Sequence, residues 1–556
     1  MDPSLEPVLY VAALALFIAF LALFPKRRLH LPHVIPSPVF LYLGIAVFLV
    51  EYLVFTTPAM QKQLADFGLL SVRITPWSLI LTIGTLAILS FVRIPKWVVA
   101  IAIVPLTFYV GQMAYYDATH FIGPIHDLLL GKPPLSSPSW YGFLPIIGLS
   151  LVFRIIPLTL VNFYIVIASI ETLGVMLLYV FALKLFQETR WATLTIALVI
   201  LFHVLVQFGD RNFYPQSTFV RFGIWLPVAW ALMSQTVRWH LISLVLAVFW
   251  TADTGMYILG AYMATALTNA RAHWVRTLLP LVLYTSGAFL GISILFRIVW
   301  GAFPRWTNYW QFALGYTSIP TFALAIPPSV IPWIFLIIPI VMVCIRAASK
   351  PIVIQFLAWL TLFTFTYYSA DSHFNALRAI NIPVIFCLVW LTKHLARFGR
   401  AAQFFIVAAA LLPTALWGQQ AFINVQAGNI LTTIQTIRHP PVTEYAVVGS
   451  TALEIKKRYQ SVLNSGDFAV ISAWDTYYLL IWNTTNKLGS NCLLCYWTPT
   501  MAKPLIDTAQ EMTVQYLFVD RERAGYEGRV SWIFDPISVH FRFVEQIGDL
   551  DVYQRL

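Results

Sequence analysis

The chain carries little charge for its length. Only 11% of its 556 residues are Asp, Glu, Lys or Arg, whereas 59% are hydrophobic. Soluble globular domains carry about 25% charged residues, so this composition excludes a protein that is soluble throughout. Apolar runs recur from Val8 to about Gly418. Since one span needs roughly 20 apolar residues, we predict an α-helical polytopic membrane domain over residues 1–420 with about fourteen transmembrane helices.

Several other sequence signals are missing. The chain has no Gly-rich phosphate loop, which argues against a nucleotide site, and no low-complexity linker. Its net charge of +11 is not concentrated in one basic cluster, so we expect no nucleic-acid partner. The absence of an inverted repeat counts modestly against a secondary transporter. No basic residue precedes the first apolar run, so we expect that run to remain as a span rather than to be cleaved as a signal peptide.

The basic residues that are present follow the apolar runs in an alternating pattern. Lys and Arg fall in every second connection, at Lys26–Arg28, Arg93, Lys96, Lys184, Arg190, Arg238, Arg271, Arg276, Arg346, Lys350, Lys393, Arg397 and Arg400. Cytoplasmic connections carry this excess of positive charge. The pattern predicts a multi-pass protein of the cell (inner) membrane, with segment 115–145 and the C-terminal region outside the cytoplasm. One long span through Asp253, in place of two, would invert the upstream part.

The last part of the chain has mixed polarity, with short apolar runs that alternate with helical stretches. Residues 440–556 therefore predict a small C-terminal α/β soluble domain, with buried strands at FAVIS and VQYLFVD and a terminal hairpin. Two of the four cysteines, Cys492 and Cys495, form a CxxC pair there. One such pair offers too few thiolates for a structural zinc site, and a local disulfide and free thiols both stay open.

Ionisable residues are concentrated in segment 115–145, directly after an apolar run. Five lie within a few turns: Asp117, His120, His126, Asp127 and Lys132. Ionisable groups beside lipid are costly unless they face water or a partner, so this concentration predicts an active site. No HExxH spacing is present, and we therefore predict no metal ligands, although a divalent cation at His120, His126 and Asp127 stays open.

Further outer connections contain Arg221, Asp253, His373 and Arg378. Each has a structural alternative. Arg221 and Arg378 would also suit snorkelling to lipid headgroups, and Asp253 would suit a helix cap. The aromatic residues around Trp306 are typical of a membrane-interface belt. We predict a site because several connections on the same side of the membrane carry ionisable residues, and not because of any single residue.

Segment 116–145 resembles the first outer loop of GT-C glycosyltransferases, in a bacterial group whose loop reads approximately D-x-H-H, G-P-I-x-D, G-K and S-Q-Y-G. The matching residues are Asp117, His120, Gly123, Pro124, Asp127, Gly131, Lys132, Ser139, Tyr141 and Gly142. The segments YPQSTFVRFG, TADTG and YYSADSHFNALRAINIP also resemble that group. The chain departs from the pattern at Ala118 and Thr119, where a second histidine is usual, and at Trp140.

This resemblance implies a GT-C-like fold and sugar transfer from a polyprenyl-phosphate donor to an unknown glycan, lipid or protein acceptor outside the cytoplasm, among membrane lipids. Asp117 would act as general base, with His120 as a second catalytic residue. The lipid phosphate would be bound by Arg378, Arg221, His373 and Lys132. The residues that would bind substrate or position the loop are His126, Asp127, Tyr141 and Asp253. No cofactor is implied.

Three other functions fit the same residues. A transporter or flippase of lipid-linked sugars would bind the same phosphate headgroup, and ionisable residues near the middle of the membrane would favour it. An O-antigen polymerase or ligase would use a diphosphate-linked oligosaccharide. A noncatalytic assembly subunit would tolerate replacement of Asp117.

Overall fold

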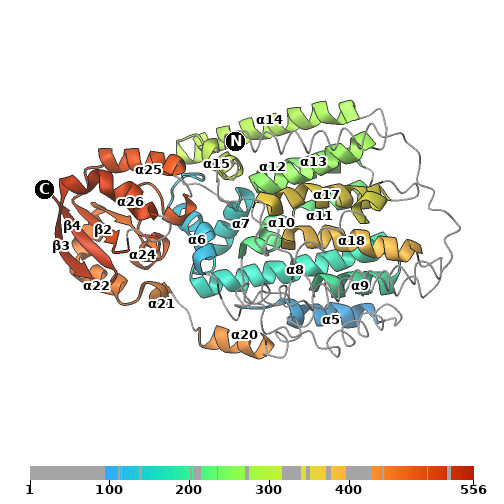
Figure 1. Cartoon of the computed structure of the whole chain (residues 1–556), viewed down its shortest axis with the longest axis horizontal. Helices are drawn as coiled ribbons and strands as arrows, with labels where there is room; N and C mark the ends of the chain where they lie inside the picture. Colours follow the sequence, from blue (N-terminus) through green and yellow to red (C-terminus); the bar gives the residue numbers. More distant parts are fainter. Residues whose placement is uncertain are drawn as a thin grey trace, which may run out of the picture.

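The computed structural model of the chain is mostly helical and carries a small sheet at the C-terminal end (Figure 1). It describes residues 94–110, 113, 115–136, 141–200, 203, 215–234, 236–268, 274–315, 340–345, 351–370, 377–395, 429–440, 444–496, 499–522 and 528–556. His373 lies outside these ranges, and of Arg378 only the backbone is described. The expected roles of these two residues therefore stay predictions.

Long apolar helices run side by side and form a bundle along the long axis of the molecule (Figure 1). The helices up to residue 395 are α5 (Lys96–Thr107), α6 (Tyr115–Leu129), α7 (Leu144–Phe153), α8 (Leu160–Phe186), α9 (Thr189–Val199), α10 (Phe219–Phe222), α11 (Trp225–Ser234), α12 (Val237–Trp250), α13 (Ala252–Thr268), α14 (Trp274–Trp300), α15 (Trp306–Gly315), α17 (Ile352–Ala370) and α18 (Leu377–Leu395), with the 3-10 turn η2 (Pro215–Ser217) before α10. One apolar core joins α8, α9, α11, α13, α17 and α18.

Two of the described helices are long and apolar enough to cross a membrane. They are α8, over Leu160–Phe186, and the segment Leu279–Trp300 of α14. The other apolar helical stretches, counted over residues whose side chains are described, are 10–17 residues long. The expected number of about fourteen spans is therefore not supported. Within the described residues, one apolar run is interrupted: α12 ends at Trp250, Thr251 is extended, and α13 begins at Ala252.

The C-terminal part, residues 444–556, confirms the predicted α/β composition. Its strands are β1 (Phe468–Ile471), β2 (Tyr516–Asp520), β3 (Phe541–Ile547) and β4 (Leu550–Arg555), in the sheet order β1-β2-β4-β3. Strands β1 and β2 are parallel, whereas β4 pairs antiparallel with both β2 and β3. Helix α20 (Asn429–Arg438) precedes this part. The helical elements within it are α21 (Glu444–Val448), α22 (Thr451–Arg458), α23 (Gln460–Ser465), α24 (Asp475–Trp482), η6 (Leu493–Cys495), α25 (Pro499–Glu511), α26 (Arg529–Phe534) and η8 (Asp535–His540).

Segment 115–145 was expected to be a loop, but its first half is the helix α6. This helix lies between the bundle and the C-terminal part (Figure 1). Its apolar residues Phe121, Ile122 and Ile125 are fully buried in a core shared with the sheet strands and α24. The loop is helical because its apolar face is covered by a region more than 300 residues away in the sequence, which local patterning does not reveal.

Two polar contacts reinforce this docking. The Tyr477 hydroxyl donates to the Tyr115 carbonyl oxygen over 2.7 Å, at the start of α6. The Glu444 carboxylate accepts a hydrogen bond from the Leu160 backbone N–H, at the start of α8. The C-terminal part is thus held against the end of the bundle where the predicted site residues lie.

Candidate functional site

Four of the predicted site residues come together at the end of the bundle. They are His120 on α6, Tyr141 before α7, Arg221 on α10 and Asp253 on α13, and we call them the Arg221 cluster. The Arg221 guanidinium donates to the Asp253 carboxylate over 2.5 Å. Its central carbon lies 5.1 Å from the centre of the Tyr141 ring, and the rings of Tyr141 and His120 are 5.4 Å apart. Segments widely separated in the sequence therefore meet in one polar cluster.

The local structure around Arg221 fixes its position. Helix α10 is a single turn, capped by the Thr218 hydroxyl, which accepts from the Val220 N–H over 3.4 Å. The Phe219 N–H donates to the Glu171 carboxylate over 2.9 Å. Asp253 lies in the first turn of α13, where the partial positive charge of the helix end favours a carboxylate. The Arg221–Asp253 pair thus joins the starts of two helices.

Tyr141 is placed by the glycine that follows it. Gly142 has φ of +112°, and a Cβ atom there would lie 2.1 Å from the Trp250 carbonyl oxygen. The same oxygen accepts the Phe143 N–H over 2.9 Å. Only glycine permits this close approach at positive φ. The glycine of the motif's Tyr-Gly pair is therefore required by the contact with the end of α12.

Arg221 is not available at the surface in this arrangement. Its side chain is 1% exposed and that of Asp253 is 5% exposed. An ion pair buried to this degree needs both partners, because either charge alone would be costly. The expected role of Arg221 as a phosphate ligand would require the pair with Asp253 to open. The geometry favours a positioning role for both residues.

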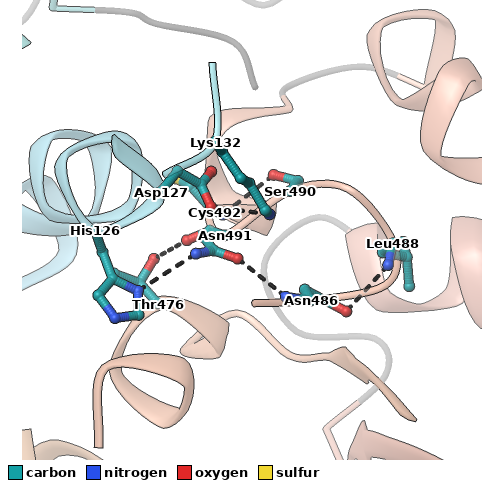
Figure 2. A network of polar contacts seen from close by, with 9 residues as sticks. All are labelled: His126, Asp127, Lys132, Thr476, Asn486, Leu488, Ser490, Asn491 and Cys492. Atoms are coloured by element: carbon teal, nitrogen blue, oxygen red, sulfur yellow. Dashed lines mark hydrogen bonds and ion pairs between the residues drawn. The ribbon is translucent and has the colours of Figure 1, made fainter. Parts of the chain in front are cut away.

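A second group of polar residues lies where α6 meets the C-terminal part (Figure 2). Lys132 forms an ion pair with Asp127 over 2.9 Å. The Asn491 side-chain amide lies 3.4 Å from His126 Nδ1, and the Asn491 carbonyl oxygen accepts the Thr476 hydroxyl over 2.5 Å. We call these residues, His126, Asp127, Lys132, Thr476 and Asn491, the α6 interface network.

Two ionisable groups, His126 of the α6 interface network and the neighbouring Asp475, lie in environments that shift their pKa values. Burial, and secondarily the charge of Lys132, lowers the pKa of His126 to about 4. Burial raises the pKa of the Asp475 carboxyl, although that carboxyl accepts the Thr476 and Leu493 backbone N–H groups. The negative charge of Asp127 adds to this rise. His126 is therefore neutral when α6 and the C-terminal part are docked at neutral pH.

Asp117 lies in the first turn of α6 and is half-buried. The Tyr477 phenol is close enough for the charge of Asp117 to contribute to the raised pKa of that phenol, after the larger effects of burial and Glu444. Asp117 precedes His120 by three residues, so both side chains lie on the same face of α6. The predicted base and the Arg221 cluster therefore share one helix.

A small, mostly apolar hollow, with room inside for about one water molecule, lies beside Gly142. It is lined by Pro124, Leu128, Pro133, Pro134, Leu135, Ser136, Gly142, Phe143, Ile146 and Ile147. The lining comes from the end of α6, the following turn and the start of α7. The hollow as it stands is too small for a lipid chain, so it carries no argument about the donor.

One group of metal-ligating residues is found in the described part of the chain. It consists of His120, Cys492 and Cys495, with one possible ligand atom from each lying within 4.8 Å of the others. Cys492 and Cys495 are joined as a disulfide. His126 and Asp127, which the sequence suggested for a cation together with His120, belong instead to the α6 interface network.

Three functional candidates were missed in the sequence. Glu171 and His203 form a buried contact of 3.0 Å inside the bundle, and Glu171 is the only acidic residue of α8. A lone carboxylate in a long apolar helix is a recognisable signal that we did not use. Asn491 had no such signal, because its contact with His126 joins residues that are 365 positions apart.

Comparison with models of known protein families gives no match, and comparison with curated protein sequences gives none either.

Proposed function

We propose that this protein is a membrane glycosyltransferase that moves a sugar from a polyprenyl-phosphate donor to an acceptor hydroxyl. The gathering of His120, Tyr141, Arg221 and Asp253 in one cluster carries the proposal. A structural bundle gains little from collecting ionisable groups of separate helices at one end, since burying them is costly. The resemblance of segment 116–145 to the first outer loop of GT-C glycosyltransferases supports a lipid-linked donor.

The proposed reaction needs a base and a means of stabilising the leaving phosphate. Asp117 takes the proton of the acceptor hydroxyl while the acceptor oxygen attacks the anomeric carbon. The bond from that carbon to the phosphate oxygen breaks, and the electron pair leaves with the lipid phosphate. Lys132, Arg378 and His373 are the proposed phosphate ligands. The Arg221–Asp253 pair would hold Tyr141 and His120 in place.

The proposal includes a location. We place the protein in the cell (inner) membrane as a multi-pass protein, with α6, the Arg221 cluster and the C-terminal part outside the cytoplasm. The alternation of Lys and Arg along the chain supports this orientation. The two spanning candidates, in α8 and α14, are consistent with it.

The test is sugar transfer by the purified full chain from a panel of radiolabelled polyprenyl-phosphate monosaccharides to a cell-envelope extract. We expect Asp117→Asn to abolish transfer and to retain donor binding. Asp507→Asn is the matched control, because Asp507 is exposed on α25, and it should remain fully active. Full activity of Asp117→Asn would refute the assignment of the base.

A second candidate function is favoured by the Glu171–His203 pair. Ionisable pairs inside spanning helices mark proton or substrate pathways, and this feature would suit a translocator of lipid-linked sugars. Vesicles containing the purified chain distinguish the two functions. A translocator would move the donor headgroup across the bilayer without acceptor and lose this movement in Glu171→Gln, whereas the transferase would consume donor only when acceptor is present.

A further inference from the structure

His120 and the CxxC pair meet although they lie more than 370 residues apart. His120 is on α6, and Cys492 and Cys495 flank and end the short η6 turn. Both cysteines are fully buried and His120 is 1% exposed. One possible ligand atom from each residue lies within 4.8 Å of the other two. These atoms are separated by distances that a single bound cation can bridge.

The donor types match a thiophilic cation. Thiolate sulfur and imidazole nitrogen are the preferred protein ligands of zinc, and sets of two cysteines with one histidine occur in sites that keep a fourth position open. Two thiolates also balance the double charge of such a cation. The occupied site would be neutral overall, which reduces the cost of burying it.

The surroundings hold the three ligands in place. The α6 helix approaches the loop so closely that a Cβ atom on Gly123 would lie 2.6 Å from the Asn491 carbonyl oxygen and 3.2 Å from Cys492 Cβ. The Thr119 hydroxyl lies 3.5 Å from His120 Nδ1. The Ser490 hydroxyl accepts the Cys492 N–H over 3.2 Å. Contacts of this kind orient metal ligands in known sites.

We propose that the reduced, dithiol form of Cys492 and Cys495 binds one thiophilic divalent cation together with His120. An external dithiol supplies two electrons and two protons, which break the S–S bond, and is itself oxidised to a disulfide. The cation then displaces the two thiol protons. Cys492 and Cys495 can therefore either form the disulfide or bind the cation. The bound cation would add a coordinate cross-link between His120 of α6 and the C-terminal part, which the disulfide does not provide. The proposal does not rest on sugar transfer.

The test uses the purified full chain in detergent, reduced in excess dithiol, freed of the dithiol by desalting without oxygen, and then supplied with zinc or cobalt. We expect about one zinc per reduced chain and no zinc bound by the oxidised chain. Cobalt should give the charge-transfer absorption of thiolate ligands. His120→Ala should weaken zinc binding at least about tenfold, because losing even an outer-shell partner of a metal site costs that much.

Matched variants separate this site from other thiols and histidines. Cys344→Ser/Cys387→Ser removes the two other, buried cysteines and should keep zinc binding, as should His126→Gln. Cys492→Ser/Cys495→Ser should lose it. Equal zinc binding in that last variant would overturn the proposal. So would a native chain with four titratable thiols and no bound zinc, or thiols that form only when circular dichroism shows unfolding.

Discussion

At the scale of single residues, the charges at the end of the bundle are arranged in pairs. Arg221 lies against Asp253 and Lys132 against Asp127. Inside the bundle, the His203 ring lies against the Glu171 carboxylate. Each of these carboxylates is almost fully buried. Because an unpaired buried charge is costly, each pair constrains the two elements that carry it more than a surface ion pair would.

The Arg221–Asp253 pair gives the first prediction. Arg221→Met alone or Asp253→Leu alone should lower the free energy of unfolding by about 3–5 kcal/mol, because each leaves one buried charge without its partner. The double substitution leaves neither charge and should recover a large part of this loss. Thermal unfolding of the four proteins in one detergent checks the cycle. Strictly additive losses would show that the pair is not coupled.

The second prediction concerns the close approach of α6 and the CxxC loop. Gly123→Ala should destabilise the protein by about 1–3 kcal/mol, because the added Cβ meets a backbone oxygen that cannot move without the loop. Gly148→Ala on α7 is the control, since its Cβ would meet nothing within 4 Å. Helix propensity should make that control neutral or slightly stabilising. Thermal unfolding compares them, and equal midpoints would contradict the close contact.

At the scale of elements, helix ends decide where the site residues lie. Helix α8 begins at Leu160 after Thr159, whose hydroxyl accepts the Asn162 N–H over 3.1 Å. Glu444 of the C-terminal part accepts the Leu160 N–H at the same end. The backbone N–H groups in the first turn of α8 therefore find acceptors both in the helix's own cap and in a distant element.

The third prediction tests this cap. Thr159→Ala should destabilise the protein by about 1 kcal/mol, because one N–H of the first turn of α8 loses its acceptor. Thr236 occupies the same position before α12 but makes no cap hydrogen bond, so Thr236→Ala should change stability by less than about 0.5 kcal/mol. Denaturation of both variants under one set of conditions gives the comparison. A larger loss from Thr236→Ala would show that the assigned cap is not the determining contact.

At the scale of the whole molecule, the C-terminal part completes the core at one end of the bundle. The core that contains Phe121 and Ile125 also contains strands β1 and β2. The CxxC loop and Asn491 lie on the same face of contact. Docking therefore controls the environment of α6, and with it the positions of Asp117 and His120.

The fourth prediction follows from His126. Its pKa falls from 6.5 to about 4 on folding. Between these two pH values His126 is therefore mostly protonated in the unfolded chain and mostly neutral in the folded protein. Stability should therefore be retained above about pH 6.5 and be lost as the pH falls towards 4, by up to about 1.4 kcal/mol per pH unit. Asp475, whose pKa is raised, has the opposite effect, since its contribution declines as the pH rises.

Comparison with His126→Gln isolates the histidine term from that of Asp475. Glutamine stays uncharged across this range and offers the Asn491 amide an acceptor. The difference in unfolding midpoint between the native chain and the variant should change with pH between 6.5 and 4 and level off at higher pH. A difference that does not vary with pH would contradict the burial of neutral His126.

The local pattern of the C-terminal part was sufficient to predict its strands. The runs FAVIS and VQYLFVD are the parallel strands β1 and β2, and the last residues form the hairpin of β3 and β4. The helical stretch before β1 consists of three short helices, α21, α22 and α23, which are separated at Gly449, which has positive φ, and at Tyr459. Short, continuously apolar runs bounded by polar residues are predictable because neighbouring residues determine them.

The sequence by itself determined that the chain is apolar, largely helical and ended by a small α/β region, because composition and periodicity reflect local burial. It also indicated the residue types of a site, including Arg221, Asp253, Tyr141 and His120. Only the tertiary structure decided that these four residues meet and that Asp253 forms a buried ion pair with Arg221. It also decided that Asn491 and the CxxC pair lie against α6. These contacts join residues tens to hundreds of positions apart, and their geometry depends on how helices pack, which no local pattern encodes.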